Sequence, residues 1–333
     1  MTVAVDAMGG DKAPLEIVKG AAMASQTTKD KILLVGNENV ISNILSGLEY
    51  NKDKLEIVHA SEVITNEDKP TVAIRKKTDS SLVKCFSLLV DGSADAMVSA
   101  GSTGALLAGS IHFLKRIKGI KRPALVPYVP NDKNGFILVD GGANTNSRPE
   151  NLLQFAIMGS VYAEKVLKVK HPKVGLLNIG SEELKGNELV RNTFNLLVDS
   201  GLNFVGNIEA REAMLGEVDV VVCDGFAGNI LLKAVEGTGL ILFKNLKEIL
   251  TSGTLSKIAA LLLKKGLYSL KKKYDYKEHG GAPFLGVSSC VVKAHGASDA
   301  KSVAYAIKQA SDIAASGAIE AIAGQIKVSE TES

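Results

Sequence analysis

The feature that most constrains the fold is a set of short segments made only of apolar residues. Residues 32–35 read ILLV and residues 220–222 read VVV, so neither segment offers a polar face to solvent. Strands of this kind are buried on both faces, as in a largely parallel sheet that helices cover. Helical patterns alternate with these strands along the chain, and this order predicts an open, three-layer α/β/α fold.

No segment rich in Pro, Gly or Ser divides the 333 residues, so we expect one bilobed unit whose lobes are interwoven rather than tethered. The predicted strands are residues 2–5, 31–35, 55–58, 94–98, 135–139, 174–178, 204–207, 219–223 and 289–293. The predicted helices include residues 14–25, 103–114, 150–167, 188–200 and 298–323.

The composition excludes several classes of protein. The net charge is +3, aromatic residues make up 5% of the chain and tryptophan is absent, so we expect no nucleic-acid partner. The three cysteines are far apart in sequence, which indicates a reducing compartment without a disulfide framework or metal site. The chain starts without a secretory signal, and the apolar run 258–263 is far shorter than the ~20 residues that span a bilayer. We therefore expect a cytoplasmic protein.

Glycine-rich loops follow four of the predicted strands, where open parallel sheets bind their ligands. The loops are residues 6–11, 99–104, 140–144 and 224–229. Glycines let backbone N–H groups approach an anion, and a helix N-terminus adds partial positive charge. Each loop alone is equally explained as a tight turn, but four of them in one sheet favour a shared phosphate site. The predicted phosphate-binding residues are Asp6, Gly9, Gly10, Asp11, Gly101, Ser102, Thr103, Gly104, Asp140, Asn144, Asp224 and Gly228.

Further candidates lie in loops beyond other strands. Lys185 can neutralise a phosphate and Asn187 can donate a hydrogen bond to one, although Asn187 is also a good N-cap for the next helix. His295 follows the last predicted strand, and it is a candidate general acid or a structural histidine. The chain has neither a P-loop nor a complete dinucleotide fingerprint, so no nucleotide cofactor is expected.

A basic, amphipathic segment stands apart at residues 254–273. Its apolar residues follow helical spacing, and six lysines supply charge. Together with the apolar stretch before it, this segment predicts a helical hairpin over residues 230–273. The commoner meaning of the pattern is a core or dimer contact with a solvated lysine face. The other interpretation is an interfacial helix on an anionic membrane, contacted through Leu255, Ile258, Leu262 and Leu263.

Several motifs lie in order over essentially the whole chain. They are residues 3–11, 99–106, 116–120 with 122–124, 175–180, 185–188, 224–229 and 293–296. Together they resemble the bacterial phosphate acyltransferase (PlsX) family. One position departs from the family pattern, since Ser102 stands where Asn is usual, and a side-chain role for this position is therefore in doubt.

The resemblance implies reversible transfer of a fatty acyl group from acyl carrier protein to inorganic phosphate, which gives acyl phosphate for phospholipid synthesis. It also implies a fold similar to isocitrate/isopropylmalate dehydrogenase and phosphotransacetylase, a homodimer, and peripheral contact with the inner face of the cell membrane. Because phosphate is itself the nucleophile, such a site requires an anion pocket and donors for the oxyanion. Lys185, Asn187 and Asn229 are the candidates for these roles, and His295 is the candidate proton donor to the leaving thiolate.

Three other functions remain open from the sequence. A phosphotransacetylase-like enzyme would use acyl-CoA as donor on the same fold. A decarboxylating, NAD-dependent dehydrogenase would also share the fold, but metal-ligand spacing and a nucleotide fingerprint are missing. A membrane-bound scaffold would recruit the next acyltransferase without chemistry of its own.

Overall fold

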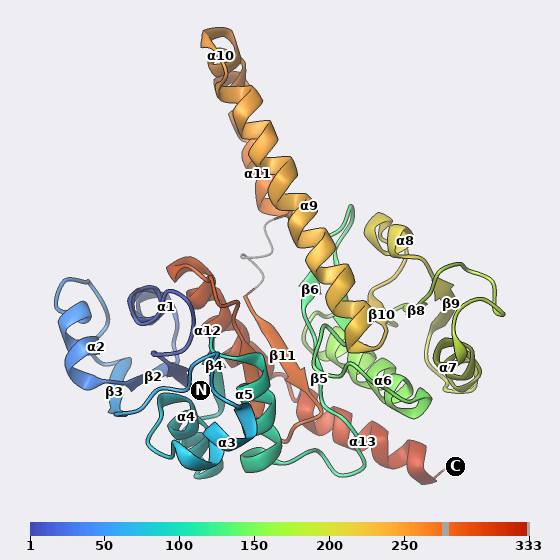
Figure 1. The fold of residues 1–333 in the computed structure, drawn as a ribbon, viewed down its shortest axis with the longest axis horizontal. Coiled ribbons are helices and arrows are strands. Elements are labelled where there is room, and N and C mark those ends of the chain that lie inside the picture. The colour runs from blue at the N-terminus through green and yellow to red at the C-terminus, as the bar shows by residue number, and fades with distance from the viewer. Residues whose placement is uncertain (275–279, 332–333) are drawn as a thin grey trace.

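The structure, a computed structural model, describes residues 1–274 and 280–331. Its described strands form two sheets, one in each lobe, with a helical projection above them (Figure 1). The first sheet has the order β3-β2-β1-β4-β12-β11-β5 and the second has the order β6-β7-β10-β8-β9. The prediction that the four glycine loops belong to one sheet is therefore wrong, because β1 and β4 lie in the first sheet and β7 and β10 in the second.

The first sheet is parallel at its centre. β1 pairs in parallel with β2 and β4, and β4 pairs in parallel with β12. β11 runs antiparallel to both β12 and β5 at the edge nearest the second lobe. The strands are β1 (Thr2–Asp6), β2 (Lys31–Gly36), β3 (Leu55–His59), β4 (Ala96–Ser99), β5 (Ala124–Leu125), β11 (Ala282–Leu285) and β12 (Cys290–Lys293).

The second sheet has β10 at its centre, between β7 and β8, and both pairings are parallel. The three valines of β10 are fully buried, which confirms the prediction made from their wholly apolar run. β6 closes one edge in antiparallel orientation. The strands are β6 (Tyr128–Val129), β7 (Phe136–Val139), β8 (Val174–Leu177), β9 (Phe204–Ile208) and β10 (Val220–Val222).

Helices cover the sheets, and the C-terminal helix ties the lobes together. α6 packs on β7 and β10 of the second sheet, and α13, which follows the last strand of the first sheet, packs on α6. The predicted helix 298–323 is in fact two helices, since Gly317 has a φ of +69° that ends α12. The helices are α1 (Leu15–Thr27), α2 (Glu38–Leu45), α3 (Pro70–Lys76), α4 (Ser81–Val90), α5 (Thr103–Gly109), the π-helical η1 (Ser110–Leu114), α6 (Pro149–Lys165), α7 (Glu188–Val198), α8 (Ala210–Leu215), α12 (Ala300–Ala315) and α13 (Ala318–Thr331).

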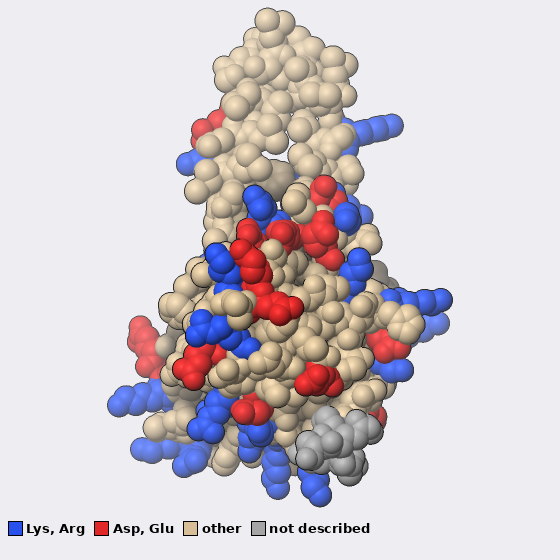
Figure 2. All heavy atoms as spheres, turned by 90° about the vertical axis from the view of Figure 1, so that its right-hand side faces the viewer, with Lys and Arg blue, Asp and Glu red and all other residues tan. Residues whose placement is uncertain are grey.

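The projection consists of α9 (Gly225–Thr251), α10 (Thr254–Leu262) and α11 (Lys264–Tyr274). α9 leaves the second lobe, and α10 and α11 return beside it (Figure 1). None of the residues of α10 and α11 is buried. By length and composition α9 is apolar enough to cross a membrane, although charged side chains interrupt it. On the face seen in Figure 2 the tip of the projection shows no charged side chain, whereas the body carries both signs of charge.

Candidate functional site

The four glycine loops occur as two pairs, one on each lobe. The loops after β1 and β4 are neighbours because these strands pair directly, and the same holds for the loops after β7 and β10. All four lie at the carboxyl ends of parallel strands, where α/β sheets bind ligands. Each lobe therefore contributes one pair of glycine loops.

The first pair is held together by Asp6. Its carboxylate accepts hydrogen bonds of 2.6 Å from the hydroxyls of Ser81 and Ser99, and burial raises its pKa. Gly9 lies so close that a Cβ there would be 2.4 Å from Asp6 Oδ2 and 2.9 Å from the backbone nitrogen of Gly101. Asp6 and Gly9 thus fix the relative position of the two loops, and both oxygens of the carboxylate are occupied by donors of this chain.

The second pair is held in the same way by Asp140, which is fully buried. Its two carboxylate oxygens accept five hydrogen bonds, and burial raises the pKa of the group. Asn144 supplies two of the donors, at 2.7 and 2.9 Å, and its amide also donates to the carbonyl of Pro123 at 2.7 Å. The other donors are the backbone N–H groups of Leu125, Gly142 and Ala143.

The first turn of α9 packs directly on this loop. The N–H of Gly225 donates to the carbonyl of Asn144 at 2.8 Å, and a Cβ on Gly228 would lie 2.0 Å from the carbonyl oxygen of Asp140. Asp224 caps the helix, because its Oδ1 accepts from the N–H groups of Phe226 and Ala227. These glycines are required by close packing, and Asp224 by helix capping.

A cavity of about 170 Å³ lies between the two pairs of loops. Thr103 at the start of α5 and His295 beyond β12 reach it from the first lobe, and Asn229 on α9 reaches it from the second. Three of the predicted site residues therefore meet around one space. Lys233 and Lys293 also border this cavity and were not predicted. We call it the cleft.

Lys293 is the most perturbed group of the cleft. The pKa of its ammonium is lowered to about 8, mainly by burial and also by the nearby Lys233, while the Asp11 and Asp6 carboxylates oppose the shift. Its Nζ donates to the carbonyls of Ala100, at 3.4 Å, and Ala294. An ammonium has three N–H donors. Among the described residues these two carbonyls are its acceptors, so one donor remains for a ligand.

His295 lies two residues beyond Lys293. Its Nδ1 accepts a hydrogen bond of 3.1 Å from the N–H of Ala297, which assigns the proton of the neutral ring to Nε2. Burial lowers the pKa of His295, and the nearby Lys233 ammonium adds to this effect. The ring is therefore neutral at pH 7 and acts as a donor through Nε2–H.

The remaining predicted residues of the first lobe lie within its two glycine loops and do not line the cleft. Gly10 has a φ of +116°, a conformation that glycine adopts readily. Asp11 follows it, and its N–H donates to the carbonyl of Gly296 at 2.9 Å. Ser102 is the residue before α5, and a Cβ on Gly104 would meet the ring of Pro70 at 3.0 Å. Gly104 thus lets α5 pack on α3.

Lys185 and Asn187 lie beyond β8, the strand next to β10, and thus at the same edge of the second sheet. In the described part of the chain neither residue borders the cleft. Lys185 is exposed, and its Nζ lies 3.8 Å from Glu182 Oε1. Asn187 accepts a hydrogen bond of 3.0 Å from the N–H of Val190, which confirms the alternative interpretation that it caps α7.

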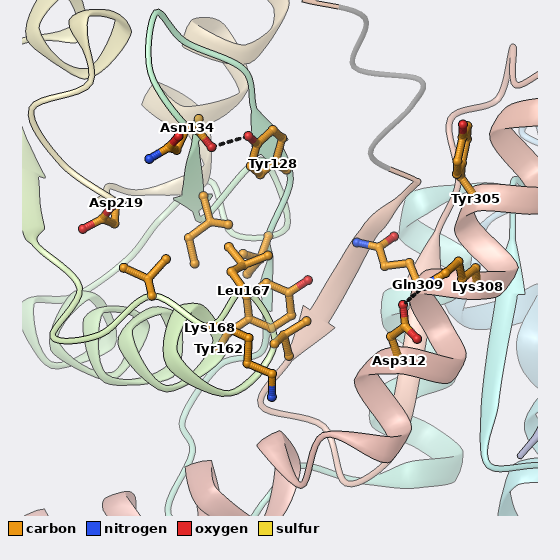
Figure 3. Close-up of a pocket in the computed structure, with 15 residues that line it drawn as sticks. Tyr128, Asn134, Tyr162, Leu167, Lys168, Asp219, Tyr305, Lys308, Gln309 and Asp312 are labelled. Carbon is orange, nitrogen blue, oxygen red and sulfur yellow. Dashed lines mark hydrogen bonds and ion pairs between the residues drawn. The ribbon is translucent and has the colours of Figure 1, made fainter. Parts of the chain in front are cut away.

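A larger cavity, of about 810 Å³, lies at the opposite edge of the second sheet (Figure 3). Gly135 and Asp219 border it just before β7 and β10 begin, and α12 forms its other wall with the ion-paired Lys308 and Asp312. None of the four glycine loops reaches it. Ligands in such sheets bind at the carboxyl ends of the strands, so the smaller cleft is the candidate site.

The described residues contain no group of three or more His, Cys, Asp or Glu side chains that could hold a metal ion. Cys85, Cys223 and Cys290 are buried, and burial raises the pKa of all three thiols. A buried, protonated thiol is a poor nucleophile. The chemistry of the cleft therefore rests on ammonium, imidazole, amide and backbone groups.

Comparison with known proteins identifies the family of the chain. Residues 1–321 match the family model described as fatty acid synthesis protein. A phosphate acyltransferase of Alkaliphilus oremlandii is 52% identical over 310 residues, 93% of this chain and 92% of the relative. A phosphate acyltransferase of Clostridium acetobutylicum is 48% identical over 328 residues, 98% of this chain and 99% of the relative.

Two solved structures share the fold at low sequence identity. A phosphotransacetylase from Streptococcus pyogenes superposes with a TM-score of 0.64 at 16% identity, covering 95% of this chain and 94% of the other. The EutD phosphotransacetylase from Staphylococcus aureus gives a TM-score of 0.61 at 16% identity, covering 94% of each chain. The predicted phosphotransacetylase-like fold is confirmed. By its family match and its full-length relatives, the chain belongs to the phosphate acyltransferases of the fatty acid synthesis protein family.

Proposed function

We propose that this chain transfers a fatty acyl group reversibly from acyl carrier protein to inorganic phosphate, giving acyl phosphate for phospholipid synthesis. The observation that carries the proposal is the Lys293 ammonium, which borders the cleft, is partly buried and has one N–H donor left for a ligand. A partly buried cation beside closely packed glycine loops favours a small, multiply charged anion. The family supplies the acyl group as the second substrate.

The reaction needs positioning and charge rather than a protein nucleophile. Phosphate bound at Lys293 attacks the thioester carbonyl carbon with one oxygen, and the carbonyl oxygen becomes an oxyanion. Asn229 and His295 border the cleft from opposite lobes, and we assign them as the donors to that oxyanion. The C–S bond then breaks as the carbonyl re-forms, and the thiolate leaves with a proton that the phosphate gives up. The buried thiols take no part.

The test is phosphate-dependent release of free thiol from palmitoyl-acyl carrier protein, with acyl phosphate detected by mass. We expect release that requires phosphate and falls strongly in Lys293→Met. Acetyl-CoA is the donor that tests the alternative function, a phosphotransacetylase-like reaction. Turnover of acetyl-CoA but not of the acyl carrier protein would contradict the proposed donor. Folded protein that is inactive with both donors would contradict the proposed reaction.

We also propose that the projection serves a homodimer and a peripheral, anionic membrane contact of a cytoplasmic enzyme. Ile230, Ile241 and Leu242 of α9 are exposed in the single chain, and a second copy would cover them. At the tip, Leu255 is 83% exposed and Leu262 is 81% exposed, with Ile258 and Leu263 beside them. Lys257, Lys264 and Lys265 are close to these residues in the sequence and supply positive charge for an anionic surface.

Sedimentation and liposome flotation test these two contacts separately. We expect a dimer in solution, and flotation with anionic vesicles that is lost in the double variant Leu255→Ser with Leu262→Ser. Leu184→Ser is the matched control, because Leu184 is 86% exposed but lies outside the projection. Flotation of the double variant like the unmodified protein would exclude the tip as the membrane contact, and a monomer would exclude the dimer.

A further inference from the structure

A second, mostly apolar cavity continues from the cleft along α9. Its volume is about 270 Å³, and it adjoins the cleft, because Tyr128, Leu232 and Glu236 line both spaces. The walls beyond the shared residues are apolar over most of their length. They are formed by Val129, Pro130, Val235, Gly239, Leu240 and Phe243. We call this space the channel.

The channel is straight because one helix face lines it. Its residues on α9 are spaced by three or four positions from 232 to 243, which is one stripe of an α-helix. Eleven residues of helix rise about 16 Å. An extended alkyl chain advances roughly 1.25 Å per carbon for C–C bonds of about 1.5 Å. The stripe therefore matches about 13 carbons.

Charged groups lie at the two ends of the channel. At the junction with the cleft, Glu236 is 16% exposed and its carboxylate pairs with the Lys233 ammonium at 2.7 Å, so both charges are neutralised there. Farther out, Lys271 and Tyr274 of α11 and Asp299 contribute to the border. The space thus leads from a polar site into an apolar lining, which suits a molecule with a polar head and an alkyl tail.

We propose that the channel holds the alkyl chain of the acyl substrate, with the reacting carbonyl in the cleft and the chain running along α9 toward Phe243. This assignment rests on the proposed function for the identity of the substrate. Continuity with the cleft, through three shared residues, selects an acyl chain over a peptide or a second copy of this chain. The channel then sets which chain lengths are accepted.

Gly239 offers a direct test, because it borders the channel and a Cβ there would meet nothing within 4 Å. Gly239→Leu fills the channel about 10 Å from Leu232, which leaves space for about eight carbons. We expect kcat/KM for the palmitoyl donor to fall at least tenfold while the octanoyl donor is turned over as before. Gly237→Leu is the matched control, since Gly237 also has nothing within 4 Å and does not border the channel. An equal loss for both donors, or the same loss in Gly237→Leu, would overturn the assignment.

A binding measurement separates this inference from the proposed function. The chain has no tryptophan, so Phe243→Trp places a single fluorophore at the far end of the channel. We expect quenching by palmitate brominated near its methyl end, below its micelle concentration, and none by terminally brominated octanoate. Such quenching without any phosphate-dependent transfer would overturn the proposed function and leave the channel assigned. Transfer with no quenching and no chain-length effect in Gly239→Leu would overturn the channel alone.

Discussion

Replacing Lys293 by methionine removes a buried charge while keeping the length of the side chain, and we expect stability and activity to move in opposite directions. A fall in the lysine pKa from its ordinary value of 10.5 to about 8 corresponds to about 3 kcal/mol of unfavourable burial. The variant loses two hydrogen bonds to carbonyls, at about 1 kcal/mol each. The net expectation is a gain of about 1 kcal/mol in the free energy of unfolding at pH 7.

The effect on the reaction has the opposite sign. A hydrogen bond from a charged donor contributes about 1.5–3 kcal/mol, so the KM for phosphate should rise about 10- to 100-fold in Lys293→Met. Denaturant unfolding measures the stability, and thiol release at varied phosphate measures the KM. An unchanged phosphate KM, in a variant that unfolds at equal or higher denaturant, would refute the assignment of Lys293 to phosphate.

The pH dependence provides an independent check on the same group. The unfolded chain holds the lysine proton up to about pH 10.5 and the folded chain only up to about pH 8. Between these values the unfolded state binds more protons, so the contribution of this group to stability rises with pH. The stability advantage of Lys293→Met should therefore shrink from about pH 8 upward. The phosphate KM of the unmodified enzyme should rise above pH 8, and that of the variant should not follow it.

Three further substitutions, one with a matched control, test other predicted residues of the site. Gly228→Ala puts a Cβ 2.0 Å from a carbonyl oxygen of Asp140 and should cost about 3 kcal/mol or more in chemical denaturation, whereas Gly237→Ala should gain about 1 kcal/mol as a helix substitution in open space. Asp140→Asn turns an amide donor toward N–H donors and should lower the free energy of unfolding by about 1–3 kcal/mol. An unchanged free energy of unfolding would contradict the conclusion that Asp140 holds the second pair of loops together. Lys185→Ala should change stability by less than about 0.5 kcal/mol, because the side chain is exposed, and should lower turnover; unchanged turnover would remove Lys185 from the reaction.

The local elements of the fold were predictable because their signals are local. The buried β10 and the helix cap at Asn187 follow from the residue types in a few adjacent positions. The division into two sheets was not predictable in this way. The loops after β1 and β7 both present an acid followed by glycines, and only long-range pairing decides which strand each one joins. β5 and β6 were missed because two residues each carry no pattern, and β11 was missed because Pro283 within it argues against a strand.

The polar residues of the candidate site could be predicted from the sequence, but the role of Lys293 could not. Thr103, Asn229 and His295 follow strand ends, and the structure brings them to one cleft. Lys293 ends a strand like any surface lysine, and its partial burial follows from the neighbouring loop, whose Ala100 carbonyl accepts from it. Asp6 and Asp140 share one sequence pattern with a phosphate loop, and their carboxylates are occupied by donors of this chain. The residue types of the site can therefore be predicted from the sequence, whereas the burial of each side chain depends on tertiary packing.

α9 makes the distance between two ends of the molecule a fixed quantity. Asn229 borders the cleft and Thr251 ends the helix near the tip, so 22 residues of unbroken helix separate them by about 33 Å. A fatty acyl chain of 16 carbons extends only about 20 Å. An acyl group held in the cleft cannot also reach a surface on which the tip rests. If the tip rests on a membrane as proposed, the acyl phosphate must move along α9 or leave the protein before its alkyl chain can enter the bilayer.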